Sequence, residues 1–519
     1  MVTRVEYWQV RKPAVVSDNG VVTAQHWAAA QAGAAMLKAG GNAVDAAVAA
    51  AMALNPVEPW MSGMGGSGFM VVHRAADASQ HAIEFQGAVP YGIDSADYPL
   101  DPDAPLVLMG YPACVGNCNV VGYRSINVPG AVAGLSEAHT RFGKLGWDRV
   151  LAPSVDLAES GFQVDWNVMM NIAFASAELA LDAGASATFL PGGHPPRPGT
   201  VLPRPELAAT LRRLADRGPR DFYEGETAEL LVADLKAGGS AIAAEDLAAY
   251  RANVCAPMRG PHRGAVLHTA GETSGGERLI DAFRHVAERL KPGPGIRPET
   301  YVAYADGLNA AFAARRQRRS PAAEMAPAAS TTHINAIDRD GNAAAITYTL
   351  LNRFGSKVVL PSTGILMNNG LSYFDPRPGL PDSMVGGRRV MTSNMSPTIA
   401  TVDGQVRFAV GASGANHIVP AIFCIAGFML DHGLDVEAAV HAPRIDATGR
   451  EDVQVDLHLP ADAMAALEQR FKLNVVERTV LPKQFASPSA IGRDPKTGRV
   501  AGCADVYSPS AAAFAGDPA

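Results

Sequence analysis

The sequence changes character abruptly near residue 330, and this change constrains the fold more than any other feature. Residues 320–330, SPAAEMAPAAS, have the small, proline-bearing composition of an exposed linker. The residues after them alternate as strands do, so 331–337 and 342–350 are predicted to form a β-hairpin around the turn at 338–341. A sheet-rich region therefore begins with a threonine that directly follows a segment the protein could discard.

The N-terminal region is predicted to be helical and buried. A helix from Ala43 to Leu54 is apolar nearly all round, and such a helix belongs inside a layered core. Asn42 is placed to cap this helix, with Asp45 at its third position. The helices predicted between residues 130 and 290 are interpreted as scaffold.

Glycines crowd the segment after this helix, MSGMGGSGFMVVH. Gly63, Gly65 and Gly68 match the spacing of the dinucleotide-binding pattern G-x-G-x-x-G, but that pattern needs a strand before it and a helix after it. Here a helix precedes the glycines and an apolar β-type run, 69–73, follows them. We interpret the glycines as positions where backbones pack closely, and not as a phosphate site.

Composition and charge exclude several classes of protein. The chain has 519 residues, of which 48% are apolar and 18% charged, so it can bury a large core. Its net charge of −7 argues against nucleic acid or an anionic membrane as the main partner. Five sparse cysteines do not resemble a secreted disulfide framework, and we find neither a signal-peptide core nor an apolar run that could span a bilayer. We expect a cytoplasmic location.

No metal ion or cofactor is expected from the sequence. It contains no H-E-x-x-H helix and no clustered set of His and Cys residues. Cys114 and Cys118 have no second pair of ligands near them in sequence, so we expect unpaired thiols.

Thr331 is a candidate nucleophile. Ser and Thr runs before a strand are usually caps or turn formers, and this ordinary interpretation stays open for STTH taken alone. A threonine that starts a strand after a discardable segment instead suits a hydrolase of the N-terminal nucleophile type. In such enzymes chain cleavage frees the threonine, whose own α-amino group then acts as the base for its hydroxyl.

At these residues the chain resembles the γ-glutamyltranspeptidase family, and the resemblance extends over most of its length. Each motif alone is modest, but the motifs follow one another in the family's order, which makes the match specific. They are LKAGGNAVDAAVAAAMALNPVEPWMSGMGGSGFM, NVPGAVAGLSEAHTRFG with APSVDLAESGFQV, TSGG, TTHINAIDRDGNAAAITYTL, NNGLSYFDPRPG, MSPTIA, VGASGANHI and APRID.

The resemblance implies the fold and the processing of the chain. The expected fold is α/β (α+β), a four-layer αββα sandwich of the N-terminal nucleophile type. The expected cleavage is at the Ser330–Thr331 bond, giving a large subunit of residues 1–330, which ends in the flexible pro-segment 320–330, and a small subunit of residues 331–519. The two processed subunits would remain together as a heterodimer, and a higher oligomer stays open.

The same resemblance implies the catalytic residues. Thr331 would be the nucleophile in both cleavage and turnover, and Thr349 would hydrogen-bond the Thr331 hydroxyl. For Thr349 the alternative of an ordinary strand former stays open. Gly414 and Ala415 match the turn whose backbone N–H groups hold the oxyanion. Ala415 replaces a glycine there, and it can serve if its φ is negative.

The chain departs from the family at the residues that would bind substrate. Gln86, in EFQGA, stands where the family has an arginine for the α-carboxylate, and Tyr373 aligns with the acidic residue for the α-amino group. Asn352 comes one place later than the family's asparagine. Ser393 keeps the first of two adjacent serines, and Asn394 replaces the second. A neutral amide cannot replace a charged bidentate guanidinium, so recognition is expected to be altered.

Three functional hypotheses follow. The first is an autoprocessed amidase or acylase of this family whose acyl group need not be glutamyl, as in relatives that act on oxamate or on cephalosporin side chains. The second is a true γ-glutamyl hydrolase or transferase that acts on glutathione-like compounds. The third is an inactive paralogue that only binds. The expected partner is a small-molecule amide, with no nucleic acid and no membrane.

Overall fold

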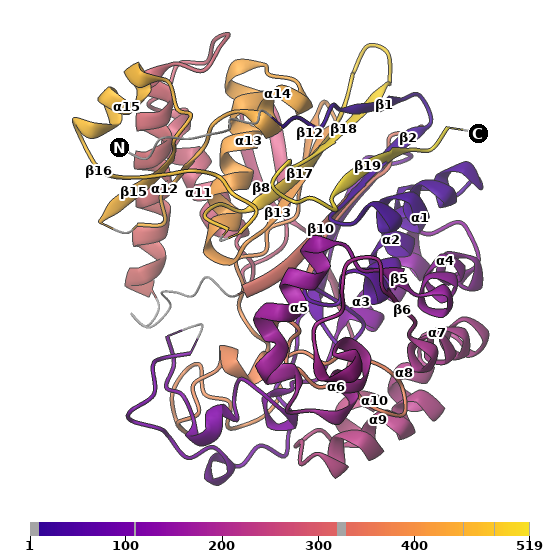
Figure 1. Ribbon diagram of the computed structural model, residues 1–519. Coiled ribbons are helices and arrows are strands. Elements are labelled where there is room, and N and C mark those ends of the chain that lie inside the picture. Colours follow the sequence, from indigo (N-terminus) through magenta and orange to yellow (C-terminus); the bar gives the residue numbers. More distant parts are fainter. Residues whose placement is uncertain (1–9, 108–109, 319–328, 450, 482, 518–519) are drawn as a thin grey trace.

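The computed structural model describes residues 10–107, 110–318, 329–449, 451–481 and 483–517. Two antiparallel sheets of seven strands each lie face to face at its centre (Figure 1). Helices cover the outer face of each sheet. The four-layer αββα sandwich is confirmed, and the order of its layers explains why nearly every residue of the central strands β10 (Ala329–Asp338) and β11 (Ala343–Asn352) is buried.

The first sheet contains the predicted hairpin at its centre. In spatial order it consists of β19 (Ala512–Ala515), β2 (Gly20–Ala24), β10 (Ala329–Asp338), β11 (Ala343–Asn352), β3 (Ser67–Arg74), β4 (Ser79–Phe85) and β7 (Asn253–Cys255). Strands β10 and β11 pair with each other, and their other edges pair with β2 and β3. The hairpin is thus clamped between strands from the N-terminal region.

The second sheet stacks on the first. Its strands, in spatial order, are β1 (Val15–Ser17), β18 (Val500–Ala504), β17 (Ser487–Arg493), β13 (Gln405–Ser413), β12 (Thr398–Val402), β9 (Ala265–Thr269) and β8 (Met258–His262). A cluster of buried aliphatic side chains fills the space between the two sheets, including Val21, Val71, Ile337, Ile399, Ala409 and Ile491.

Helix α2 (Ala43–Val57) shows how the sequence specifies a layer. All fifteen of its residues are buried, because it lies between the first sheet and helix α4 (Trp147–Ser160). The predicted capping box is present: the side chain of Asn42 accepts from the N–H of Asp45, and Asp45 accepts from the N–H of Asn42. The helix runs to Val57 and so ends three residues later than predicted, with Pro56 in its last turn.

Other helices complete the two outer layers. On the first sheet lie α1 (Trp27–Lys38) and α3 (Ala131–Phe142), with α7 (Pro205–Arg217) behind α4. On the second sheet lie α11 (Gly276–Ala287), α13 (Ile418–His432) and α14 (Val436–His441), with α12 (Pro298–Arg318) packed against α11. Figure 1 shows these two groups on opposite sides of the strands.

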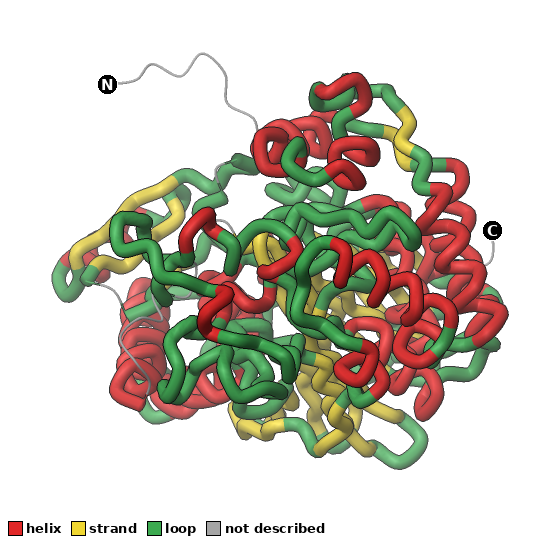
Figure 2. The backbone as a smooth tube through the Cα atoms, turned by 90° about the horizontal axis from the view of Figure 1, so that it is seen from below, coloured by secondary structure: helices red, strands yellow, loops and turns green. Residues whose placement is uncertain are grey.

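The remaining elements lie outside these four layers. They are α5 (Trp166–Leu179), α6 (Ala183–Phe189), α8 (Asp221–Glu224), α9 (Glu226–Ala237), α10 (Ala244–Ala248), α15 (Ala461–Glu468), the pair β5 (Phe162–Gln163) and β6 (Val201–Leu202), and the small sheet of β14 (Ile445–Asp446), β15 (Asp452–Asp456) and β16 (Lys472–Val476). Figure 2, seen from below, shows long loops and short helices over one end of the sandwich.

The glycine segment before β3 makes close backbone contacts, as predicted. A Cβ atom on Gly65 would lie 2.3 Å from the carbonyl oxygen of Leu366, and one on Gly68 would lie 2.4 Å from that of Thr347. No side chain larger than hydrogen fits at these distances. Gly68 therefore allows β3 to lie close to β11, and Gly65 allows the segment before β3 to lie close to Leu366.

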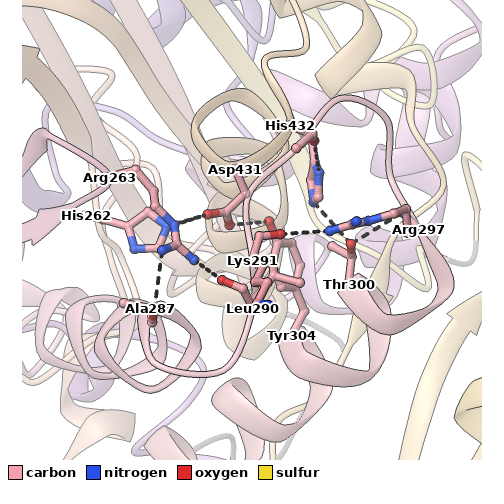
Figure 3. A network of polar contacts seen from close by, with 11 residues as sticks. His262, Arg263, Ala287, Leu290, Lys291, Arg297, Thr300, Tyr304, Asp431 and His432 are labelled. Atoms are coloured by element: carbon pink, nitrogen blue, oxygen red, sulfur yellow. Dashed lines mark hydrogen bonds and ion pairs between the residues drawn. The ribbon is translucent and has the colours of Figure 1, made fainter.

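A buried polar network joins parts of the chain that lie on either side of residue 330. Asp431, near the end of α13, accepts hydrogen bonds from His262 at 2.8 Å, Arg263 Nε at 2.9 Å and the hydroxyl of Tyr304 at 2.8 Å (Figure 3). Burial alone would raise the pKa of Asp431, but these hydrogen bonds hold it below its usual value. The network ties α13 to β8, to the turn after β8 and to α12.

Candidate active site

The predicted cleavage point coincides with an irregularity in the central hairpin. Ser330 pairs with Leu351 and Thr332 pairs with Tyr348, so the register shifts at Thr331. Leu351 adopts a φ of +83°, which is rare for a residue with a side chain. This β-bulge next to the bond was not predicted, and bulges are frequent beside active sites because they re-aim side chains.

Thr349 contacts the peptide bond that is predicted to break. Its hydroxyl donates to the carbonyl oxygen of Ser330 and accepts from the N–H of Leu351 at 2.7 Å. We expected it to bond the hydroxyl of Thr331, and in the described part of this uncleaved chain that contact is not made. The intact peptide bond brings the Ser330 carbonyl to Thr349 instead. A hydroxyl donor at this oxygen would polarise the carbonyl toward attack.

A buried carboxyl group contacts Thr332, the residue after the predicted nucleophile. The hydroxyl of Thr332 donates to Glu58 Oε2 at 2.7 Å, and Glu58 is only 3% exposed. Burial raises the pKa of Glu58 to about 8, so the group is mostly protonated at neutral pH. Glu58 was not predicted from the sequence. The available signal was an acidic residue inside the apolar stretch NPVEPWM at the end of a buried helix.

The turn after β13 has an unexpected conformation. Gly414 has a φ of 137°, and a Cβ there would lie 2.8 Å from the Cα of Ala486, so glycine is required. Ala415 has a φ of +52°, so the negative φ that we set as the condition for its N–H to serve is not what the backbone adopts. A single 3-10 turn, Ala415–His417, joins the strand to helix α13, and φ is positive at both Gly414 and Ala415. Within the described chain, neither N–H donates a hydrogen bond.

A cavity of about 530 Å³ lies beside Ser330, and we call it the Ser330 cavity. The turn residues Gly414 and Ala415 line it together with Ser330. Its remaining wall mixes apolar and charged side chains, among them Glu58, Trp60, Phe174, Arg353, Lys483 and Phe485. The structure thus brings the predicted scissile residue and both predicted oxyanion residues to one cavity. Arg353 and Lys483 were not predicted.

Three of the predicted substrate residues form a second group. The side-chain amide of Gln86 donates to the hydroxyl of Thr273, whose carbonyl oxygen accepts from the N–H of Ser393 at 2.8 Å. Asn394 donates to the side chain of Asn416 at 2.5 Å, directly after the Gly414 turn. None of the three lines the Ser330 cavity. Gln86 lines a different cavity, of about 330 Å³.

Asn352 and Tyr373 lie apart from that group. The N–H of Asn352 donates to the side chain of Asn369 at 3.1 Å, and the side-chain oxygen of Asn352 is buried without a hydrogen-bond partner among the described residues. Tyr373 is partly buried, and burial raises the pKa of its hydroxyl. Neither residue lines the Ser330 cavity.

The described ranges contain neither a metal-binding cluster nor a membrane-spanning helix. No group of three or more His, Cys, Asp or Glu side chains within them is placed to hold a metal ion. In the same part of the chain, every helix is too short or too polar to cross a bilayer.

Comparison with known proteins places this site in a family. The sequence model of γ-glutamyltranspeptidase matches residues 29–329 and 308–515, which is nearly the whole chain. The chain belongs to the γ-glutamyltranspeptidase family. The resemblance found in the sequence motifs is therefore confirmed, and so is the N-terminal nucleophile type of fold.

Individual members of the family are similar over most of their length. The chain is 32% identical to a glutathione hydrolase proenzyme of Pseudomonas sp. (strain A14), with 83% of this chain and 82% of the relative covered. It is 34% identical to the acylase ACY 1 proenzyme of Pseudomonas sp. (strain V22), with 86% of each covered. The crystal structure of a cephalosporin acylase from Bacillus halodurans matches with a TM-score of 0.83, 26% identity and full coverage of both chains.

These relatives fix the class of activity. Hydrolases and acylases made as proenzymes share this γ-glutamyltranspeptidase fold, and the protein is an autoprocessing amidohydrolase or acyltransferase of the N-terminal nucleophile type. A glutathione hydrolase and an acylase match this chain at nearly equal identity. The comparison alone therefore does not show which acyl group the protein accepts.

Proposed function

We propose that the protein is a proenzyme that cleaves its own Ser330–Thr331 bond and then uses Thr331 to hydrolyse an amide whose acyl group is not γ-glutamyl. The observation that carries the proposal is the hydrogen bond from the Thr349 hydroxyl to the Ser330 carbonyl, because this carbonyl belongs to the bond that the sequence predicts to be cleaved. The positive-φ turn at Gly414 and Ala415 supports it, because its two residues line the same cavity as Ser330.

The cleavage step follows from these contacts. The hydroxyl oxygen of Thr331 attacks the carbonyl carbon of Ser330, and the proton of the hydroxyl passes to the Thr331 nitrogen as the C–N bond breaks. The product is an ester of Ser330 on the Thr331 side chain. Water then hydrolyses this ester, which leaves a carboxylate on Ser330 and a free α-amine on Thr331. Thr349 stabilises the negative charge that develops on the carbonyl oxygen.

Turnover would repeat the same chemistry on a substrate. A free α-amine ordinarily has a pKa of about 8, so a fraction of the freed Thr331 amine is neutral at physiological pH and can take the proton of the Thr331 hydroxyl. The hydroxyl attacks the substrate carbonyl, an amine leaves, and water or an acceptor amine resolves the acyl-enzyme. A positive φ at Ala415 re-aims its N–H but does not remove the donor, so Gly414 and Ala415 would still donate to the oxyanion.

The acyl group is proposed to differ from glutamyl because of Gln86 and Tyr373. Gln86 carries no charge, and its amide is already engaged by Thr273. Tyr373 offers a neutral hydroxyl in place of a carboxylate. A zwitterionic glutamyl head bound by these two residues would lack both counter-charges, which is costly in a partly desolvated site.

A panel of p-nitroanilides tests the proposal on processed protein. We expect slow release of p-nitroaniline from the γ-glutamyl compound and faster release from at least one other acyl compound, with no release by the Thr331→Ala variant. Efficient cleavage of γ-glutamyl-p-nitroanilide that glutamate inhibits at low concentration would overturn the acyl-group assignment in favour of a γ-glutamyl hydrolase. Absence of any amide cleavage by processed protein would overturn the proposed function as a whole.

A further inference from the structure

Glu58 is the one carboxyl group among the described residues that line the Ser330 cavity. It directly follows helix α2, and its backbone carbonyl oxygen accepts from the N–H of Met61 at 3.1 Å. The carbonyl oxygen of Met61 in turn accepts from the N–H of Leu350 at 3.0 Å. The backbone of β11 thus holds Glu58 at this end of the central hairpin.

The side chain of Glu58 is held close to the predicted nucleophile. The hydroxyl of Thr332 donates to Glu58 Oε2 at 2.7 Å. The covalent path from that hydroxyl to the Thr331 nitrogen spans at most about 7 Å when fully extended. The carboxyl oxygen therefore lies within about 10 Å of the nitrogen that cleavage would free. Ser330, on the other side of that bond, lines the same cavity as Glu58.

Other charged and titratable groups surround Glu58, and most of them are cations or already have a partner. They are Arg353, Lys483 with buried Asp505 beside it, His417 with Asp446 at 2.6 Å, and Tyr348, whose hydroxyl donates to the carbonyl oxygen of Ala51. Cleavage also creates a carboxylate on Ser330, which stays ionised from about pH 5 upward and so does not titrate with the amine. Glu58 is therefore the acidic group of the cavity wall whose charge changes near neutral pH.

Glu58 titrates in the same pH range as an α-amine. Burial raises the pKa of Glu58 to about 8, and a free α-amine has an ordinary pKa of about 8. An ionised carboxyl group favours the charged form of a nearby amine. At a distance of about 10 Å, this attraction shifts the titration of the amine upward by roughly one pH unit. Because the Thr331 hydroxyl needs a neutral amine as its base, the charge of Glu58 bears directly on activity.

We propose that Glu58 is a positioning residue for the freed α-amine of Thr331: the ionised carboxyl group holds the amine in its charged form, so the amine acts as a base only at higher pH. This inference rests on the proposed function and deepens it, because it names the group that sets the pH range of catalysis. The Thr332 hydroxyl is the contact that holds the carboxyl group in place.

Competitive labelling of processed protein with acetic anhydride tests the proposal without a substrate, because only a neutral amine reacts. Mass spectrometry measures the acetylation of the small chain's N-terminus as a function of pH. Glu58→Gln should lower the midpoint of this titration by roughly one pH unit relative to wild type. Thr332→Val should shift it in the same direction, since the ionised carboxyl group loses its hydroxyl donor. Glu288→Gln, at a side chain that is 74% exposed, is the matched control and should leave the midpoint unchanged.

The pH profile of activity provides a second measurement. For a p-nitroanilide that the processed protein cleaves, the pH at which kcat/KM reaches half its maximum should fall in Glu58→Gln by the same amount as the labelling midpoint. An unchanged value would show that Glu58 does not set the pH range of catalysis.

The outcomes separate the inference from the function on which it rests. Equal labelling midpoints for wild type and Glu58→Gln would overturn the role of Glu58 and leave the amidase standing. Absence of a small chain that begins at Thr331 would overturn the proposed function itself. If Glu58→Gln fails to fold or to be cleaved, Thr332→Val decides, and a midpoint equal to that of wild type would then show that our inference is wrong.

Discussion

At the scale of single residues, the account of cleavage depends on the hydrogen bond from the Thr349 hydroxyl to the Ser330 carbonyl. Thr331, Thr349, Gly414 and Ala415 were identified from short patterns, and the structure brings Thr349 into contact with the Ser330 carbonyl and the turn residues into the cavity beside it. The backbone conformation of Ala415 could not be predicted, because it depends on the turn between a strand and a helix. Charges such as those of Arg353 and Lys483 stood out only once the fold had shown what surrounds them.

Thr349→Val should slow chain cleavage. The change keeps the shape of the side chain and removes the donor to the Ser330 carbonyl. Loss of one catalytic hydrogen bond of about 1.4 to 2.7 kcal/mol corresponds to a roughly 10 to 100-fold lower rate. The time course of two-chain formation on a denaturing gel measures it. A normal rate of cleavage would return Thr349 to the status of an ordinary strand former.

Glu58→Gln should change how stability depends on pH. The pKa of Glu58 is raised in the folded protein, so the folded state binds the extra proton and wild-type stability falls as pH rises from about 4.5 toward 8. The glutamine variant carries no such proton. Relative to wild type it should gain on the order of a few kcal/mol in unfolding free energy between about pH 5 and pH 8.

Urea denaturation at the two pH values measures this difference. The matched control is Glu288→Gln, because the side chain of Glu288 is 74% exposed, and its difference from wild type should be the same at both pH values. A constant difference for Glu58→Gln as well would show that the pKa of Glu58 is not raised in the folded protein.

At the scale of elements, long and strongly patterned segments were predictable. Helix α2, its capping box, the hairpin of β10 and β11 and the glycine contacts of β3 all follow from local composition. The bulge at Thr331 does not, because one extra residue in a strand leaves the alternation on either side intact. The register of β10 and β11 is also fixed by their pairing with β2 and β3, which lie far away in sequence.

Ala415→Gly should stabilise the turn at the end of β13. An alanine at a φ of +52° costs roughly 1–2 kcal/mol compared with right-handed backbone, and glycine avoids this cost. We expect the unfolding free energy to rise by about 1 kcal/mol. The same change at Ala438, inside helix α14, should lower it by about 1 kcal/mol. A loss at both positions would contradict the conformation described for Ala415.

At the scale of the whole molecule, the fold explains how a cleaved chain stays together. Each of the two large sheets contains strands from both sides of the Ser330–Thr331 bond. The hydrogen bonds around Asp431 also join α13, which follows this bond, to β8 and α12, which precede it (Figure 3). The layered class was predictable from the family motifs. The hydrogen bonds to Asp431 were not predictable, because His262, Arg263 and Tyr304 belong to no motif. They come into contact with Asp431 only through tertiary packing.

Asp431→Asn should weaken the association of the two processed chains. The variant removes the charge that His262 and Arg263 share, and breaking a buried ionic contact costs on the order of 3 kcal/mol. Size-exclusion chromatography in increasing urea should show the chains separating at a lower concentration than in wild type. Asp306→Asn is the control: its partner Arg470 is 56% exposed, so this pair should matter little.

The intact mass of purified protein tests the central claim most directly. Wild-type protein should give two chains, and N-terminal sequencing of the smaller should read Thr-Thr-His-Ile, as cleavage before Thr331 requires. The Thr331→Ala variant should give one chain of about 54 kDa, since it lacks the attacking hydroxyl. A small chain that begins at another residue, or a Thr331→Ala protein that still splits at the same bond, would contradict the assignment of Thr331 as the nucleophile.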